Sequence, residues 1–329
     1  MSILTVSELR THFRGEHGPV RAVENVSLTL KSGETIAIVG ESGSGKSVTS
    51  LSIMRLLAEG RARSSGRIEF LGRDILSLSE AEMRKIRGNE IGMIFQEPMS
   101  SLNPLLTIGR QIAETLILHQ RLSRAQARAR AIEMLRLVDI PAAEQRIDEY
   151  AHQLSGGMRQ RVMIAMALVC EPKLLIADEP TTALDVTIQA QVLELMSDLQ
   201  KRTGTAIILI THDLGVVADV ADRVIVMYAG RTVEEAPTKD LFRQPLHPYT
   251  RGLLATIAKL GSSLDDNAPT RLTEIPGQVP SLHEFIPGCA FASRCPLVTD
   301  LCRHTAPIFE AVELDHKVAC HHVERRLQA

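Results

Sequence analysis

The stretch Gly40-Glu41-Ser42-Gly43-Ser44-Gly45-Lys46-Ser47 decides the fold that we expect for this chain. It follows a short apolar run over 35–39, which predicts a buried strand, and it precedes apolar spacing that predicts a helix over 46–57. Glycines let consecutive backbone N–H groups turn around phosphate oxygens, and the start of a helix adds favourable potential for an anion. The stretch therefore predicts a phosphate-binding loop. A Gly/Ser-rich turn that happens to precede a helix is the alternative.

The side chains of this loop suit a nucleotide and its metal ion. Lys46 can neutralise phosphate charge, and the hydroxyl of Ser47 can ligate Mg²⁺. ATP and Mg²⁺ are therefore the expected ligands. The residues predicted to bind the nucleotide here are Gly40, Ser42, Gly43, Ser44, Gly45, Lys46, Ser47 and Val48.

A second group of polar residues follows two later apolar runs. Asp178 and Glu179 come directly after the run over 174–177, where the first carboxylate can hold the Mg²⁺ shell and the second can orient water for in-line attack. His212 follows another such run and is a candidate γ-phosphate sensor. Read alone, Asp-Glu-Pro is more often a solvated turn, and a single His is more often a structural hydrogen-bonding residue. The phosphate loop in the same chain favours the catalytic interpretation.

Composition excludes several other classes of protein. The 329 residues include 37 Lys and Arg against 39 Asp and Glu, so a strongly basic nucleic-acid surface is not expected. The chain has no Trp, which leaves little material for base stacking. It shows neither an apolar run long enough to span a bilayer nor a signal peptide, so we expect an intracellular protein without its own membrane span.

Periodicity along the rest of the chain predicts an α/β protein. Two alternating segments near the N-terminus suggest an antiparallel edge sheet, and compact apolar runs suggest buried parallel strands. From about Pro237 the many prolines and glycines predict a looser tail rather than more sheet. The expected strands are 3–9, 20–30, 35–39, 174–177, 206–211 and 223–227, and the expected helices are 46–57, 123–138 and 156–169.

Taken together, the motifs resemble the nucleotide-binding subunit of an ATP-binding-cassette (ABC) transporter, from about residue 4 to 244. Leu154-Ser155-Gly156-Gly157-Met158 is similar to that family's signature, with Met where Gln is commonest. Gln96 matches the Q-loop glutamine, and Asp185 matches the D-loop aspartate. Phe13 is the nearest aromatic to the segment where the family stacks adenine, and an ordinary surface aromatic is the alternative.

The resemblance implies a fold and a set of roles. The fold is an α/β P-loop NTPase (RecA-like) core with an antiparallel β edge subdomain and a helical signature subdomain over about 98–169. These parts form a nucleotide-binding domain over 1–244, and a Cys-rich C-terminal extension follows over 245–329. Two subunits meet head to tail, so Ser155, Gly156 and Gly157 serve the partner's nucleotide. The implied catalytic residues are Glu179, His212 and Gln96, and the implied Mg²⁺ ligands are Ser47, Gln96 and Asp178.

A narrower resemblance points to the ATPases of bacterial oligopeptide and dipeptide importers, a group that includes nickel and glutathione systems. It rests on Met99-Ser100-Ser101-Leu102-Asn103-Pro104, on Leu246-His247-Pro248-Tyr249-Thr250 and on the Cys-rich tail. It implies a second ATPase subunit, a paralogue rather than a copy, with two membrane permeases and an extracytoplasmic solute-binding protein. The permeases would dock near 96–112. The chain would then be peripheral on the cytoplasmic face of the inner membrane.

Four cysteines in the tail, Cys289, Cys295, Cys302 and Cys320, form a candidate metal site. Four thiolates can hold Zn²⁺ or a [4Fe–4S] cluster, and free thiols are the third possibility. Zinc sites commonly use two-residue spacers, whereas the intervals here are 6, 7 and 18 positions. The importer resemblance implies [4Fe–4S]. In a zinc site, one of the nearby histidines His316, His321 and His322 could replace a thiolate. The fifth cysteine, Cys170, is expected to be a core residue.

Functions in other classes fit less well. A DNA-repair ABC ATPase would need a long coiled-coil insertion, and a translation-associated one would normally carry two cassettes in one chain. An unrelated P-loop kinase would lack the signature at 154–158. The sequence leaves open which cargo is carried and whether the second ATPase is identical to the first.

Overall fold

The computed structural model describes residues 2–16, 18–58, 60–96, 101–181, 186–256 and 275–323. The chain divides into two compact units that are interleaved in sequence. Unit 1 comprises Met1–Leu4, Thr29–Thr35 and Glu69–Ile210, and unit 2 comprises Thr5–Leu28, Ile36–Ile68 and Thr211–Ala329. The boundary expected at 244/245 therefore falls inside unit 2.

Unit 1 contains three adjacent parallel strands, in the order β8-β7-β6. They are β6 (Ile91–Ile94), β7 (Leu174–Asp178) and β8 (Ala206–Ile210), and every residue of β7 and β8 is buried. Continuous apolar runs of this kind suit strands covered on both faces, because a parallel sheet exposes neither face to water. Ile94 pairs with Ala177, and Asp178 pairs with Ile210, so the carboxyl ends of these strands share one edge.

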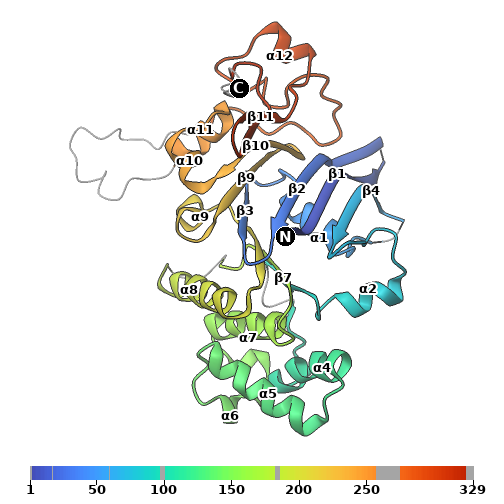
Figure 1. The fold of residues 1–329 in the computed structure, drawn as a ribbon, viewed down its shortest axis with the longest axis vertical. Helices are drawn as coiled ribbons and strands as arrows, with labels where there is room; N and C mark the ends of the chain where they lie inside the picture. Colours follow the sequence, from blue (N-terminus) through green and yellow to red (C-terminus); the bar gives the residue numbers. More distant parts are fainter. Residues whose placement is uncertain are drawn as a thin grey trace, which may run out of the picture. The chain divides into compact units, whose positions relative to one another are not determined.

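Helices make up the middle of unit 1, and those between residues 108 and 168 lie together in Figure 1. Ser123 begins one of them with a reciprocal capping box, as predicted, because its hydroxyl and the side chain of Gln126 satisfy each other's backbone N–H groups. The helices are α2 (Glu80–Ile86), α4 (Ile108–Gln120), α5 (Arg124–Leu137), α6 (Ala143–Arg146), α7 (Gly156–Leu168) and α8 (Val186–Thr203), with a 3₁₀ turn at Ala151–Gln153.

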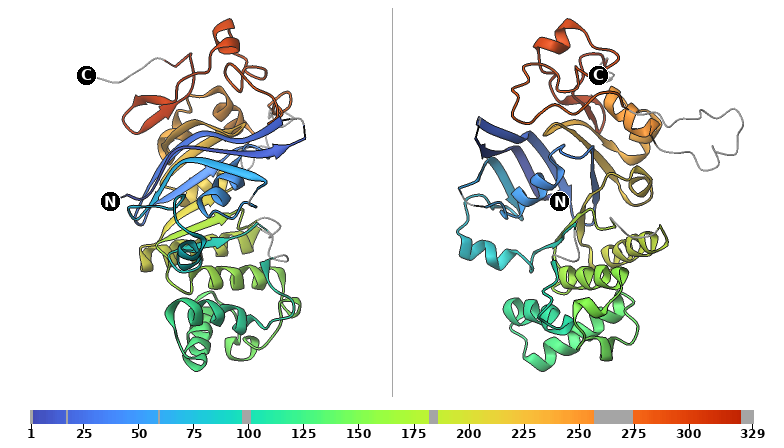
Figure 2. Two further views of the ribbon diagram at one scale, coloured as in Figure 1. Left: turned by 90° about the vertical axis from the view of Figure 1, so that its right-hand side faces the viewer. Right: turned by 180° about the vertical axis from the view of Figure 1, so that it is seen from behind.

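Unit 2 holds most of a sheet in the order β2-β1-β4, with α1 beside it (Figure 2). Its strands are β1 (Ser2–Gly15), β2 (Gly18–Lys31) and β4 (Ala62–Phe70), so the two N-terminal strands are longer than predicted. The hydroxyl of Thr11 on β1 lies 2.8 Å from that of Ser52 on α1 (Lys46–Ile53). The helix is shorter than predicted because Arg55 adopts a left-handed φ of 50°, which ends it. In unit 1, the two-residue β5 (Arg73–Asp74) pairs antiparallel with the end of β4.

The rest of unit 2 contains five neighbouring strands in the order β11-β12-β10-β9-β3. Strand β3 (Thr35–Val39) is parallel to β9 (Arg223–Tyr228), whereas β10 (Arg231–Pro237) is antiparallel to β9. The expectation of a tail without further sheet is wrong. A hairpin of β11 (Glu310–Glu313) and β12 (His316–Val318) extends the sheet, because β12 pairs antiparallel with β10. The helices are α9 (Leu214–Val220), α10 (Thr238–Arg243), α11 (Pro248–Ala255) and α12 (Asp300–His304).

A buried carboxylate fastens the tail hairpin to β10. Glu234 on β10 accepts hydrogen bonds from the backbone N–H groups of Leu246 and His247, at 2.7 and 3.0 Å. Its Oε1 also lies 2.8 Å from Nε2 of His316 on β12, and both side chains are almost fully buried. A buried carboxylate is tolerated only when it is paired and hydrogen-bonded, so this network requires the hairpin to lie against β10.

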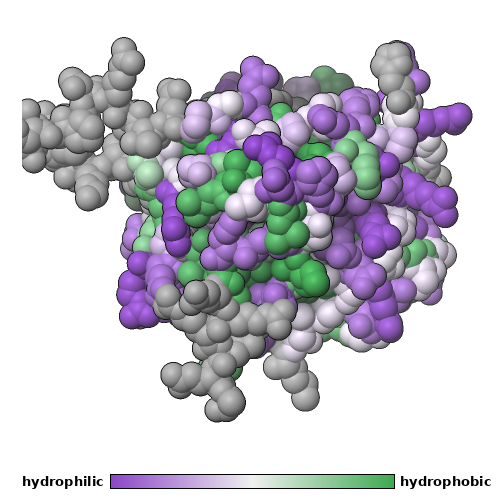
Figure 3. All heavy atoms as spheres, turned by 90° about the horizontal axis from the view of Figure 1, so that it is seen from above, coloured by the Kyte–Doolittle hydropathy of each residue, from purple (hydrophilic) through white to green (hydrophobic). Residues whose placement is uncertain are grey.

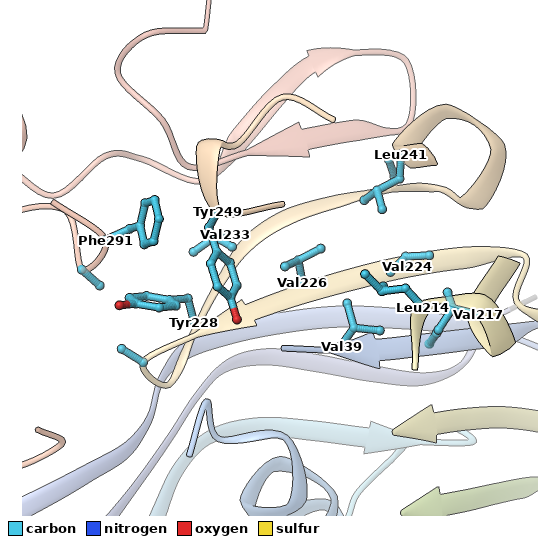
Figure 4. Packing of buried hydrophobic residues seen from close by; sticks show 14 residues of the cluster. Val39, Leu214, Val217, Val224, Val226, Tyr228, Val233, Leu241, Tyr249 and Phe291 are labelled. Carbon is cyan, nitrogen blue, oxygen red and sulfur yellow. The ribbon is translucent and has the colours of Figure 1, made fainter. Parts of the chain in front are cut away.

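An aromatic group completes the core of unit 2 (Figure 4). Tyr228 at the end of β9, Tyr249 on α11 and Phe291 in the tail pack together, with ring centroids 4.7 to 5.4 Å apart. The edge-to-face arrangements suit aromatic quadrupoles. Buried valines of β3 and β9 belong to the same hydrophobic cluster, so the tail forms part of the core of unit 2.

The tail also exposes apolar side chains to solvent. Figure 3 views the molecule from above, the side on which Figure 1 draws the tail, and shows green apolar patches among hydrophilic residues. In the described part of the chain, no helix is both long and apolar enough to cross a bilayer. The exposed apolar residues of the tail include Phe285, Leu297, Leu301, Ile308 and Leu314.

Candidate functional site

The phosphate loop lies in unit 2, between the end of β3 and the start of α1. Two of its glycines are required by close backbone contacts. A Cβ at Gly40 would collide with the Met227 carbonyl oxygen, and a Cβ at Gly45 would collide with that of Ala22; both have positive φ, at 152° and 97°. No other residue type fits these two positions, since each combines a crowded backbone with a left-handed conformation.

The side chain of Lys46 folds back onto the backbone of the phosphate loop. Its Nζ donates to the carbonyl oxygens of Gly40 and Glu41, at 2.8 and 3.0 Å, and its side chain is buried. These carbonyls hold the ammonium group beside the start of α1, whose N-cap, Gly45, provides no side-chain cap. A cation next to an uncapped helix N-terminus is an arrangement that suits an anion.

Unit 1 holds a separate group of the predicted residues, at the shared edge of β6 and β7. Asp178 is the last residue of β7 and is buried. Glu179 follows with a left-handed φ of 47°, and its N–H donates to the carbonyl of Ile210 at 2.8 Å. Gln96, two residues beyond β6, donates from Nε2 to Oε2 of Glu179 at 3.0 Å. The structure thus brings together two of the predicted catalytic residues, and the amide orients the carboxylate.

The signature segment begins α7. Ser155 is the N-cap, and its Oγ accepts a hydrogen bond from Met158 N at 3.3 Å. Ser155 and Gly156 are exposed, while buried Leu154 anchors the segment. A helix start that is exposed and glycine-rich presents backbone N–H groups to solvent, which suits binding of an anion carried by another molecule.

Two further predicted residues lie elsewhere in unit 2. His212 is exposed and immediately precedes the N-cap of α9, and Phe13 is half-buried on β1. Asp185 lies outside the described residues. The Mg²⁺ ligands predicted on both units, Ser47, Gln96 and Asp178, stay predictions.

Sequence reasoning missed two residues that fix the loop. Tyr249 and Arg294 both hydrogen-bond to Glu41, at separations of 208 and 253 positions along the chain. No spacing rule connects residues so distant. The only signal is that a charged residue occupies the second position of an otherwise Gly- and Ser-rich loop.

The tail cysteines are gathered around one region. The pKa of the Cys289 thiol is raised to about 11, chiefly by burial. The other three tail thiols further disfavour the thiolate form of Cys289. Three of the thiols face backbone N–H groups two residues later, which favour the thiolate: Phe291 for Cys289, Leu297 for Cys295 and His322 for Cys320. Cys302 Sγ lies 3.4 Å from Nε2 of His322.

Within the described ranges, no three His, Cys, Asp or Glu side chains converge so that they could hold a metal ion. The structure thus gives no support for the [4Fe–4S] or zinc site predicted at these four thiols, which stays a prediction. Cys170, by contrast, is buried at the end of α7, and burial raises its pKa to about 11, as suits a core residue.

Comparisons with known proteins agree with this geometry. Residues 23–182 match the family "ABC transporter", and residues 233–302 match "Oligopeptide/dipeptide transporter, C-terminal region". The probable peptide ABC transporter ATP-binding protein y4tR of Sinorhizobium fredii is 56% identical over 97% of this chain and 94% of its own. The oligopeptide transport ATP-binding protein AppD of Bacillus subtilis is 54% identical, over 97% and 96%.

A solved structure shares the fold. The ATP-binding cassette MJ0796, in a dimeric post-hydrolysis state bound to ADP and Pi, superposes with a TM-score of 0.65 at 31% identity, over 71% of this chain and 98% of its own. The α/β cassette fold is therefore confirmed. The chain belongs to the family of ABC transporter ATP-binding proteins that carry the oligopeptide/dipeptide transporter C-terminal region. As a member of this family it is an ATPase.

Proposed function

We propose that this chain binds and hydrolyses ATP through the phosphate loop at 40–47 and Glu179, and that the reaction drives import of di- or oligopeptides. The observation that carries the proposal is Lys46, which is held over a loop of backbone N–H groups at the start of α1. The similarity to y4tR and AppD, which are named as peptide transport proteins, supports the cargo. Nickel and glutathione are less favoured.

The residues of the chain divide the chemistry among them. The loop amides and Lys46 bind the phosphates. Ser47, Gln96 and Asp178 would hold the predicted Mg²⁺, which would neutralise the charge that develops during the reaction. Glu179, oriented by Gln96, positions and polarises the attacking water. His212 is proposed to contact the γ-phosphate. No covalent intermediate is needed, because phosphoryl transfer depends mainly on positioning and charge.

A partner ATPase would complete each site. The exposed N-terminus of α7 suits contact with a phosphate bound to the other subunit, which is the role that we propose for Ser155, Gly156 and Gly157. ATP would then stabilise the closed pair, and hydrolysis would release it. Because ATP binds the closed state better, this cycle shifts the populations of the two states.

Unit 1 also provides a surface for the proposed permeases. A groove of about 720 Å³ runs along α4 and α5, lined by Arg110, Ile117 and Leu118 among others. Leu118 is 70% exposed, and Leu105, in the loop before α4, is 82% exposed. Apolar side chains exposed in this number next to a groove mark a surface for another protein. A short amphipathic helix of the permease is the proposed occupant, which would place the chain on the cytoplasmic side of the membrane.

Transport assays test the cargo. Cells depleted of this chain are expected to lose ATP-dependent uptake of a radiolabelled tripeptide, and the wild-type gene should restore it. Restoration should fail with Glu179→Gln, which separates ATP hydrolysis from the presence of the protein. Nickel-63 and labelled glutathione serve as parallel substrates. If tripeptide uptake persists after depletion while one of these two is lost, the cargo assignment is wrong.

The tail thiols give a second test. Protein purified without oxygen is expected to contain about four iron and four acid-labile sulfides per chain, because Cys289, Cys295, Cys302 and Cys320 supply the four ligands of a cube. Cys295→Ser should lower the iron content sharply and remove visible absorption. Cys170→Ala, which changes a buried cysteine outside the group, should retain both. One zinc per chain, or no metal, would overturn the cluster proposal without affecting the ATPase.

A further inference from the structure

The second residue of the phosphate loop is held from both its backbone and its side chain. The N–H of Glu41 donates to Oη of Tyr249 at 2.8 Å. Its carboxylate accepts two parallel hydrogen bonds from Arg294, Nη1 to Oε2 at 2.6 Å and Nη2 to Oε1 at 3.0 Å. Such a bidentate pair fixes direction as well as distance, because two bonds set the plane of the carboxylate.

Arg294 is itself fully bound. Its Nε donates to the carbonyl of Pro276 at 2.9 Å, its Nη2 donates to that of Ile275 at 3.0 Å, and its Nη1 donates to Oη of Tyr228 at 3.3 Å. With the two bonds to Glu41, all five guanidinium N–H donors are used. The Arg294 side chain is 4% exposed, and its guanidinium lies 5.8 and 5.9 Å from the ring centroids of Tyr228 and Phe291. An arginine bound in this way has one orientation.

The position of Glu41 matters for the loop because its backbone also holds Lys46. Nζ of Lys46 rests on the carbonyls of Gly40 and Glu41, and the N–H of Ser44 donates to the same Glu41 carbonyl at 3.2 Å. Rotation of the Glu41 peptide would therefore displace both the ammonium group and the turn that aims the loop amides. A loop ordered before ATP arrives loses less conformational entropy when it binds.

We infer that Arg294 and Tyr249 are positioning residues of the phosphate loop, through which the C-terminal tail sets the affinity of this chain for ATP. Arg294 contacts neither the loop amides nor Lys46 and acts through Glu41. The inference rests on the proposed role of the loop. It also gives the C-terminal tail a role in ATP binding, because Arg294 belongs to the tail and immediately precedes Cys295 in the sequence.

A double-mutant cycle tests this coupling. Arg294→Met and Glu41→Gln are each expected to raise the KM for ATP, and the Kd for a non-hydrolysable ATP analogue, by ~5–20-fold, with kcat changed less than about twofold. The double variant should be no worse than the more affected single variant, because both remove the same interaction. Arg294→Lys should restore part of the affinity, since it keeps the charge but loses the bidentate fork.

The matched control is Arg87→Met. Arg87 donates a similar pair of hydrogen bonds to Glu80 in unit 1, Nη1 to Oε1 at 2.6 Å and Nη2 to Oε2 at 3.3 Å. The Arg87→Met substitution is expected to leave the KM for ATP unchanged. Wild-type KM in Arg294→Met, additive effects in the double variant, or a fall in kcat with unchanged KM would each overturn the inference. If Arg294→Met does not fold, Glu41→Gln alone decides, because it must raise KM while the tail is intact.

A parallel variant separates this inference from the function on which it rests. If Lys46→Ala strongly weakens analogue binding while Arg294→Met binds normally, only the positioning role fails. If Lys46→Ala binds the analogue as the wild type does, the phosphate-loop assignment itself fails.

Discussion

Glu179→Gln is expected to abolish steady-state ATP hydrolysis while preserving ATP binding. The change removes the carboxylate that we propose to polarise water, and loss of a general base lowers the rate by roughly 10²–10⁴-fold. Gln has the same shape, and its side-chain oxygen can still accept the bond from Gln96 that now measures 3.0 Å. The variant should therefore accumulate as an ATP-bound closed pair. Phosphate release and size-exclusion chromatography with ATP measure both effects.

Glu171→Gln provides a closely matched control. Glu171 is another acidic residue with left-handed φ, 53° against 47° for Glu179, and it is exposed and paired with Arg130. Its substitution changes the same charge in the same backbone conformation, yet hydrolysis should be unaffected. A rate above half of wild type in Glu179→Gln would show that water is activated by another residue.

Lys46→Ala is expected to weaken ATP binding by roughly 10- to 150-fold, since a charge-assisted hydrogen bond contributes roughly 1.5–3 kcal/mol. In the structure Nζ of Lys46 donates to the carbonyl oxygens of Gly40 and Glu41, and a charge-assisted hydrogen bond to a phosphate is stronger than a bond to a neutral carbonyl. Equilibrium dialysis with labelled ATP measures the loss, which also removes turnover at sub-saturating ATP.

Two controls guard this result. Lys85→Ala removes a lysine from the last turn of α2 and should bind ATP normally. Thermal unfolding of Lys46→Ala should stay close to that of the wild type, because the loop is held by its glycine contacts as well. Unchanged ATP affinity in a folded Lys46→Ala protein would contradict the loop assignment.

Local sequence patterns predicted the elements that carry the chemistry. The strand over 35–39 is observed with the same bounds, and the helix capped by Ser123 ends within one residue of the expectation. Both succeed because their signals are local: a short apolar run before glycine, and a capping box before a helical period. The hairpin formed by β11 and β12 was missed because its short strands lack clear alternation. They exist through pairing with β10 and through the buried contact between His316 and Glu234.

For the candidate site too, local patterns in the sequence predicted the residues within each motif but not the contacts between motifs. Residues within one motif, such as Lys46 and the glycines, were identified because their spacing is fixed by the loop. The hydrogen bond between Gln96 and Glu179 joins residues on different strands, and it follows from the register that sets Ile94 opposite Ala177. That register depends on pairing across the sheet, which no local pattern encodes.

By itself the sequence determined the fold class, and it predicted a phosphate loop, a signature segment and a catalytic carboxylate, because each motif depends on residue types at short, fixed spacing. Only the tertiary structure decided which distant residues support them. Glu41 meets Arg294 across 253 positions, and four cysteines separated by loops are brought within electrostatic reach of one another. These contacts arise from burial of the aromatic core around Tyr228, Tyr249 and Phe291, which depends on the packing of the whole unit rather than on any segment of it.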